Sequence, residues 1–175
     1  EHTVTEEVTG IDLVQAQLKV AGGATLSDIQ LEQSQVPPPR GYAMQLRVNM
    51  ETISADGTVK PAGGRISNFD VPTGPGLRTD TYGYSGYVTN PNYDSLLAKL
   101  VVSVNGDFAD VVRRGKRALA DFDIQGVATN IEFLERLLGH SVFADGVVTT
   151  DFIDTHIEDL VTPPADVPAG LNPAL

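Results

Sequence analysis

The chain has 175 residues, 41% of them hydrophobic, which is enough for one substantial core and too little for two ordinary ones. Its 12 Lys and Arg against 23 Asp and Glu give a net charge of −11, so its mean electrostatic field would repel nucleic acid. There is no cysteine for a disulfide or a thiolate metal site, and the spacing of His2, His140 and His156 matches no zinc-binding pattern, so no metal is expected.

The first predicted element is an amphipathic helix over residues 3–21. Thr3 and Glu6 have the spacing of a capping box, and Gly22 with Gly23 would end the helix. Apolar residues recur three or four positions apart, at Val8, Ile11, Val14, Leu18 and Ala21. Beyond the helix, the three prolines at 37–39 cannot donate backbone hydrogen bonds, which indicates a surface connection.

From Tyr42 the apolar period changes to two, which predicts a strand with Arg47 on its more polar face. Further strands are predicted at residues 65–71, 77–82, 86–88 and 96–104. The Gly and Pro content of residues 73–76 favours a turn between the predicted strands at 65–71 and 77–82. Together these elements predict an antiparallel sheet.

Two helices are predicted after the strands. Asp107 is placed to cap the first of them, while Thr129 and Glu132 have capping-box spacing before the second, which Gly139 would end. The order helix, strands, helices is typical of the α+β class, with an antiparallel sheet packed against helices.

The last residues, 162–175, are rich in proline and carry almost no periodic apolar signal, as in an exposed connector. We therefore expect one domain over residues 1–161 and a linker or tail over 162–175. A capped helix at the very first residues suggests a piece of a longer polypeptide. The chain has no apolar run of about 20 residues and no signal-peptide pattern, so a cytoplasmic location away from membranes is expected.

Three residues are candidates for chemistry, although each has a simpler explanation when taken alone. Glu1 could be a solvated residue that interacts favourably with a helix dipole, and Arg47 could belong to an exposed ion pair of little energetic consequence. Asp94 could serve only as a hydrogen-bond acceptor in a turn. The basic residues within 113–117 fit a solvated helix face or an anchor for an acidic partner. No glycine-rich segment has the spacing of a phosphate-binding loop, so no ATP-binding residue is assigned.

Several segments, taken in order, resemble the biotin carboxylase family. They read EHTVTEEVTGIDLVQAQL at 1–18, GYAMQLRVNME at 41–51, YDSLLAKL at 93–100 and GVATNIEF at 126–133, with shorter matches at 64–66 and 76–78. The resemblance implies the C-terminal part of a biotin carboxylase (ATP-grasp) module of an acyl-CoA or pyruvate carboxylase type enzyme. The family's ATP-grasp core is absent, so this chain alone is expected to be inactive.

The resemblance also implies roles for the three candidates. Glu1 resembles the glutamate of a Glu-His motif that acts as general base toward bicarbonate, a role that suits a weak base within hydrogen-bond reach. Arg47 resembles the arginine that holds bicarbonate and stabilises the enolate-like oxygen of biotin, as an always-charged fork can do. Asp94 is the candidate for a carboxylate that orients this arginine.

In the whole enzyme, the family resemblance implies ATP, magnesium and biotin on a carrier domain as cofactors. The implied partners are the biotin carboxyl carrier domain, the ATP-grasp half of the same protein and a carboxyltransferase domain or subunit, with a homodimer or larger assembly possible. Residues 73–78 correspond to a subunit-contact loop in dimeric members and lack a bulky aromatic residue.

Two other functions remain open from the sequence. The chain could be a non-catalytic interaction or scaffolding domain that docks through its acidic surface and its basic helix face. It could also belong to a carboxylase module that acts on another acceptor, such as urea. The final carboxyl acceptor is chosen by a domain that this sequence does not contain.

Overall fold

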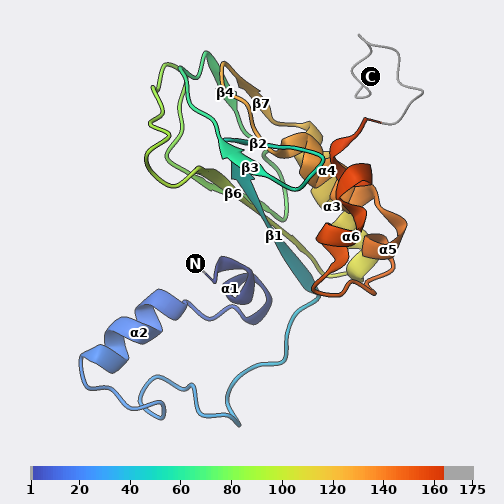
Figure 1. Cartoon of the computed structure of the whole chain (residues 1–175). Helices are drawn as coiled ribbons and strands as arrows, with labels where there is room; N and C mark the ends of the chain where they lie inside the picture. Colours follow the sequence, from blue (N-terminus) through green and yellow to red (C-terminus); the bar gives the residue numbers. More distant parts are fainter. Residues whose placement is uncertain (1, 164–175) are drawn as a thin grey trace.

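The computed structural model describes residues 2–163, so Glu1 and most of the expected tail, from residue 164 on, lie outside the described residues. At its centre is a three-stranded antiparallel sheet in the order β1 (Tyr42–Asn49), β6 (Leu96–Val104) and β5 (Leu77–Thr81). Helices α3 (Phe108–Ala120) and α4 (Ile131–Gly139) cover one face of this sheet (Figure 1). The predicted α+β class with antiparallel strands is confirmed.

Shorter elements surround this sheet. Two small antiparallel pairs join β2 (Glu51–Ile53) to β3 (Val59–Pro61) and β4 (Asn68–Asp70) to β7 (Asp123–Gln125). Helices α5 (Ser141–Ala144) and α6 (Phe152–Val161) follow α4 and pack beside it. Within residues 2–163, no helix is long and apolar enough to cross a bilayer.

The main core lies between the sheet and the helices α3 and α4. On β1, Leu46 and Val48 are buried while the residue between them, Arg47, is exposed, as the period-two pattern predicts. The core is completed by apolar residues of β6, α3 and α4: Leu100, Val102, Val111, Leu119, Leu134 and Leu138. Burying a side chain of this size contributes about 1.5–3 kcal/mol, so this layer is the main source of stability.

The N-terminal segment forms two helices, α1 (Thr3–Thr9) and α2 (Leu13–Ala21), rather than the single helix predicted. Gly10 adopts φ +70° and ends α1, and the side chain of Asp12 caps α2 by accepting a hydrogen bond from the backbone N–H of Gln15. The prediction was wrong because the apolar spacing continues across this break. The capping box was also wrong, since the Thr3 side chain is buried against the sheet instead.

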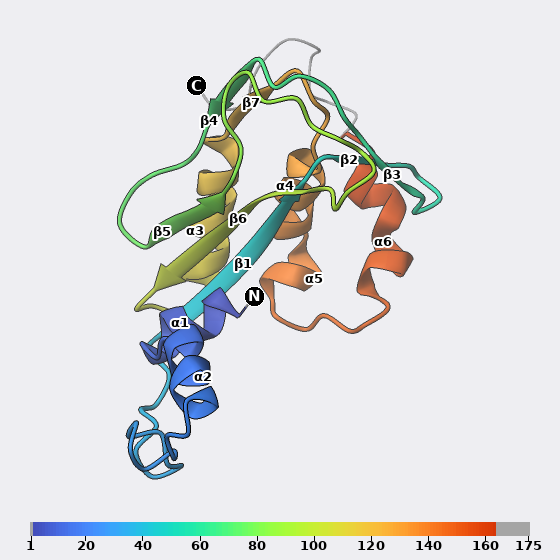
Figure 2. The same cartoon turned by 90° about the vertical axis from the view of Figure 1, so that its left-hand side faces the viewer.

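Within residues 2–163, the larger part of the apolar face of α2 is left uncovered. Val14 and Leu18 are 62% and 68% exposed, and α2 has no buried residue. Figure 2 shows α2 and the segment after it extending away from the sheet. The amphipathic pattern of this helix therefore presents an uncovered apolar surface.

The strand predictions hold best where one face of the strand is buried. The strands starting at Tyr42 and at Leu96 are confirmed, and β5 ends one residue before the predicted end. Of residues 65–71, only 68–70 form a strand, and of residues 86–88 only Val88 pairs, in a single bridge with Arg65. The small strands β2, β3 and β7 and the helices α5 and α6 were not predicted.

Of the two helix N-caps predicted after the sheet, one is confirmed and one is wrong. The N-cap at Asp107 is confirmed, because its side chain accepts from the N–H of Asp110 and Asp110 reciprocates. The capping box at Thr129 and Glu132 was wrong, since Asn130 is the N-cap of α4 and its side chain bonds to β1 rather than to its own helix. Helix α4 ends at Gly139, as predicted.

Candidate functional site

The face of the central sheet opposite α3 and α4 carries a row of charged side chains. Arg47 of β1 lies opposite Lys99 of β6, which lies opposite Asp80 of β5. Lys99 Nζ is 3.6 Å from an oxygen of Asp80, while the Arg47 side chain is 49% exposed. Arg47 and Lys99 are therefore neighbouring positive charges, and Asp80 pairs with Lys99 on the side away from Arg47.

Asp94 is brought close to Arg47 by the turn that precedes β6. Its Oδ1 lies 4.0 Å from Nη2 of Arg47 and accepts a hydrogen bond of 2.8 Å from the backbone N–H of Leu96. The structure thus places two of the sequence-predicted residues side by side. The contact is long and exposed, so it stabilises little by itself and leaves the guanidinium donors accessible to a ligand.

Helix α1 lies against β1 and β6 on this same polar face. Thr3 donates from Oγ1 to Oε1 of Gln45 at 2.6 Å, and Gln45 precedes Arg47 by two residues, so the two side chains share a face. Glu6 and Glu7 approach Arg78 of β5 at 3.9 and 3.7 Å. These contacts fix the start of the described chain beside the strand that carries Arg47.

Arg78 also pairs with Asp80, which completes the charged arrangement. The Nε of Arg78 donates to Oδ1 of Asp80 at 2.8 Å, and this hydrogen bond raises the pKa of Arg78. Burial raises the pKa of Asp80, but the hydrogen bond from Arg78 and the charges of Arg78 and Lys99 outweigh it, so the pKa of Asp80 is lowered. Asp80 is therefore an ionised carboxylate committed to Arg78 and Lys99.

A buried polar network behind the sheet fixes the backbone at Arg47. The side chain of Asn130 accepts from the N–H of Asn49 at 2.9 Å and donates to the carbonyl oxygen of Arg47 at 3.1 Å. It also donates to Glu51 at 3.3 Å. Because Asn130 is only 7% exposed, these bonds are shielded from water and hold the end of β1 firmly.

The same network reaches the turn that carries Asp94. Glu51, 9% exposed, accepts from the side-chain Nδ2 of Asn49 at 3.2 Å and from the Ser95 hydroxyl at 3.1 Å. Ser95 directly follows Asp94, so one buried carboxylate connects the two segments that present the candidate site. Sequence reasoning missed Glu51 and Asn130, because no local pattern indicates partners that come from distant segments.

Three tyrosines form an aromatic group near the Asp94 turn. Tyr87 contacts Tyr82 and Tyr84, with ring centroids 5.6 and 5.4 Å apart. Burial raises the pKa of Tyr82 most, and the nearby Tyr87 and Asp94 raise it further, so its phenol stays neutral. Tyr93 is 76% exposed. Tyr82 lines a pocket together with Asp80 and Lys99, so the aromatic group borders the charged row of the sheet.

The arrangement as a whole can bind an anion through Arg47 and Lys99 beside an aromatic surface. Glu1, the third predicted residue, lies outside the described residues. Within residues 2–163, this face holds no phosphate-binding loop. The fold and the site therefore define an α+β domain that presents an incompletely paired arginine on the polar face of its sheet.

Comparison with known families gives this domain its class. Residues 45–155 match the family "Biotin carboxylase C-terminal domain", and residues 1–29 match "Carbamoyl-phosphate synthase L chain, ATP binding domain". The first match covers more than half of the chain and includes Arg47, Asp94 and Asn130. The chain belongs to the biotin carboxylase C-terminal domain family.

Individual relatives agree with this assignment. The chain is 44% identical over 156 residues to a pyruvate carboxylase of Aspergillus niger, covering 88% of this chain and 13% of that protein. It is 42% identical over 159 residues to the mitochondrial pyruvate carboxylase of Homo sapiens, covering 90% and 13%. The chain therefore spans only a small part of these relatives.

Solved structures share the fold. A single-chain, multi-domain long-chain acyl-CoA carboxylase superposes with a TM-score of 0.87 at 42% identity, over 97% of this chain and 18% of that one. A second structure is the biotin carboxylase domain dimer of Hydrogenobacter thermophilus 2-oxoglutarate carboxylase, in complex with MgADP, ADP and bicarbonate. It superposes with a TM-score of 0.80 at 33% sequence identity, over 94% of this chain and 35% of that one.

Proposed function

We propose that this chain supplies the bicarbonate-holding and biotin-activating part of a biotin carboxylase, completed by an upstream ATP-grasp region. The observation that carries the proposal is the Arg47 guanidinium, half exposed on the polar face of the sheet. Its backbone is held by buried Asn130, and its only ion pair among the described residues is the long one to Asp94. A rigidly placed and incompletely paired arginine is suited to an anionic ligand.

In this proposal Arg47 acts twice. It first holds bicarbonate while one bicarbonate oxygen attacks the γ-phosphorus of ATP, which forms carboxyphosphate and releases ADP. It then stabilises the negative charge on the ureido oxygen as biotin loses its N–H proton and attacks the carboxyl carbon, with phosphate as leaving group and as acceptor of that proton. A charge aimed at an oxyanion that develops during reaction lowers the barrier more than one that binds only the ground state.

Glu1 is proposed as the general base that removes the bicarbonate proton. Its support is the position of the residues that follow it, because Thr3 is buried against Gln45 on the face that presents Arg47. Asp94 is proposed to orient the arginine from 4.0 Å, with the Ser95–Glu51 bond holding its turn.

ATP and Mg²⁺ are proposed to bind the upstream region rather than this chain. Only residues 1–29 match an ATP-binding domain family, and α2 within that match exposes Val14 and Leu18. We propose that the rest of the ATP-binding region covers this apolar face, since exposed residues of this kind mark an interface. The related 2-oxoglutarate carboxylase domain, solved in complex with MgADP and bicarbonate, supports these ligands for the whole module.

The proposed partners follow from the multidomain relatives. A biotin carboxyl carrier domain would deliver biotin to the Arg47 face, and a carboxyltransferase domain or subunit would use the product. A homodimer is proposed by analogy with the dimeric related domain. The proposed division into a domain over 1–161 and a linker over 162–175, and the cytoplasmic location, stay predictions.

The proposal is tested by bicarbonate-dependent ATP hydrolysis, with and without free biotin, for residues 1–175 and for the protein extended upstream through the ATP-binding region. Activity limited to the extended protein and raised by biotin would support it. Inactivity of both proteins, with both folded, would favour the scaffolding function. Turnover that biotin does not raise would favour another acceptor, such as urea.

A further inference from the structure

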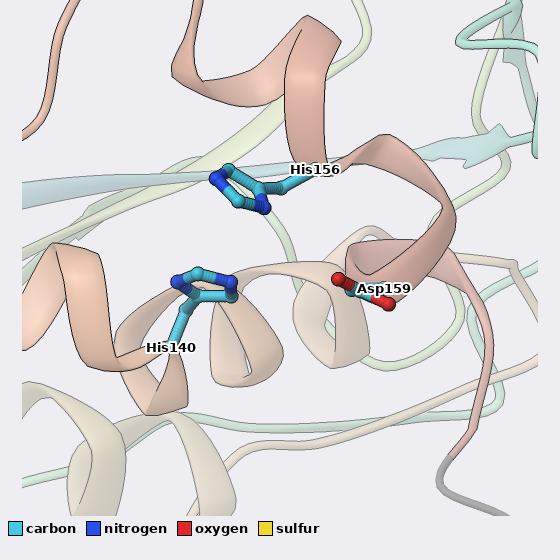
Figure 3. A group of neighbouring side chains, drawn as sticks. All are labelled: His140, His156 and Asp159. Atoms are coloured by element: carbon cyan, nitrogen blue, oxygen red, sulfur yellow. The ribbon is translucent and has the colours of Figure 1, made fainter.

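Two histidines and an aspartate that are distant in sequence lie together on the helical side of the domain. His140 stands at the junction of α4 and α5, while His156 and Asp159 are three residues apart on α6 and share one helix face. One ligand-capable atom from each residue lies within 4.8 Å of the other two. Figure 3 shows the two imidazoles and the carboxylate gathered between the helices.

Packing rather than hydrogen bonding holds the two imidazoles. Their ring centroids are 4.5 Å apart, and they lie 5.1 and 4.9 Å from the ring of Phe152. Nδ1 of His140 is buried and has no hydrogen-bond partner among residues 2–163. A buried polar atom without a partner is costly, so the ring of His140 has unused binding capacity.

The charges around these side chains favour a cation. Helix α6 carries Asp154, Glu158 and Asp159 and contains no Lys or Arg. Asp159 lies in its last turn, where the helix dipole disfavours a negative charge. On the neighbouring helix α4, Arg136 is already engaged, because it pairs with Glu132 and donates to the carbonyl oxygens of residues 160 and 161.

We propose that His140, His156 and Asp159 form a binding site for Zn²⁺ or a similar transition metal ion. Two imidazole nitrogens and one carboxylate oxygen suit zinc, whereas Mg²⁺ and Ca²⁺ prefer oxygen ligands alone. This site differs from the expectation of no metal, because the fold brings together histidines whose sequence spacing matches no zinc pattern. It is independent of the carboxylase proposal.

The geometry requires a modest adjustment. Zinc bonds of about 2.0–2.2 Å place tetrahedral ligand atoms about 3.5 Å apart, so atoms that lie within 4.8 Å of one another must approach by at most about 1.3 Å. Asp159 is exposed and His156 only partly buried, so both side chains have room to change rotamer. Three protein ligands leave a fourth position for water. The ion would tie the α4–α5 junction to α6 and thereby stabilise the helical side of the domain.

The test is a zinc titration of residues 1–175 in competition with a chromophoric chelator, followed by thermal unfolding with Zn²⁺ or Mg²⁺. We expect one equivalent of zinc to bind and to raise the unfolding midpoint, with no rise from Mg²⁺. His156→Phe retains an aromatic ring beside Phe152 but removes both nitrogens, and Asp159→Asn is conservative at an exposed position. Each should weaken binding by more than about tenfold, since even groups outside the ligand shell affect metal affinity by about 10–100-fold.

His2→Phe is the matched control, because it removes the histidine that lies outside the cluster. It should leave zinc affinity unchanged. Zinc binding that persists at native strength in both His156→Phe and Asp159→Asn would overturn the site, as would no stoichiometric binding by the native chain. If His156→Phe unfolds, Asp159→Asn alone decides.

Discussion

Asn130 Nδ2 donates a hydrogen bond of 3.1 Å to the backbone carbonyl oxygen of Arg47, across 83 positions of sequence. The N-terminal end of α4 thereby holds the strand position from which the guanidinium projects. The same amide contacts buried Glu51, which connects to the turn before β6. The candidate site therefore depends on a residue that need not touch any ligand.

Asn130→Ala should lower both stability and biotin carboxylation in the upstream-extended protein. The substitution leaves the Asn49 N–H and the Arg47 carbonyl without their partner, and each buried unsatisfied group costs about 1–3 kcal/mol. Urea unfolding and steady-state kinetics measure the two effects. Asn92→Ala, at an exposed position of the turn, is the control and should change neither. Native-like turnover of Asn130→Ala would show that the network does not position Arg47.

Asn130→Asp should be more damaging than its size suggests, because it places a second carboxylate beside Glu51. Adding Glu51→Gln restores a donor and removes the repulsion, so the double variant should be more stable than Asn130→Asp alone. A double-mutant cycle in urea measures this coupling, expected in the range of about 0.5–3 kcal/mol for residues in contact. Additive effects would contradict the direct contact.

The sequence predicts the elements whose signal lies in neighbouring residues, and it misses contacts between segments that are far apart in the chain. The strands at Tyr42 and Leu96 follow from alternation and apolar content, because one face of each packs on α3 and α4. The break at Gly10 was missed because apolar spacing runs through it. Asn130 was hidden within an expected capping box, since nothing local indicates that its side chain bonds to β1.

The candidate site was only partly predictable. Period-two alternation placed Arg47 on the polar face, but its role came from family resemblance. The distance of 4.0 Å between the Asp94 and Arg47 side chains depends on the turn before β6. The position of Arg47 opposite Lys99 depends on the register between β1 and β6. Glu51 was not selected, because burial of a carboxylate depends on partners from three separate segments.

Asp80 should make the stability of the domain dependent on acid pH. A carboxylate whose pKa is lowered on folding binds protons more readily in the unfolded chain, so its contribution is present above the unfolded pKa of about 3.9 and is lost as pH falls through the lower folded pKa. Asp80→Asn should therefore be less stable than the native chain at pH 6. Urea unfolding from pH 2.5 to 6 should show this difference narrowing below about pH 4.

The control for Asp80 is Glu158→Gln, which alters an exposed carboxylate without an ion pair among residues 2–163. Its difference from the native chain should stay nearly constant with pH. A constant difference for Asp80→Asn as well would mean that its ion pairs with Arg78 and Lys99 do not stabilise the fold.

The exposed face of α2 should matter only when the upstream region is present. Leu18→Ser should change the stability of residues 1–175 by less than about 0.5 kcal/mol, because the side chain is 68% exposed. Leu100→Ala, at a fully buried position, should cost about 2–5 kcal/mol in the same protein. In the extended protein, Leu18→Ser should lower the unfolding midpoint. Strong destabilisation of residues 1–175 by Leu18→Ser would show that this chain covers α2 itself.

We propose that the Arg47 face becomes a carboxylation site once the ATP-binding region is attached. The direct measurement is incorporation of radiolabelled bicarbonate into free biotin by the upstream-extended protein, comparing the native residue with Arg47→Ala. Removing one preorganised donor from a developing oxyanion costs about 10²–10³ in rate, so we expect a loss of that order with an unchanged unfolding midpoint. Arg117→Ala, at an exposed position of α3, should retain native turnover. Carboxylation by Arg47→Ala at the native rate would show that Arg47 does not take part in the reaction.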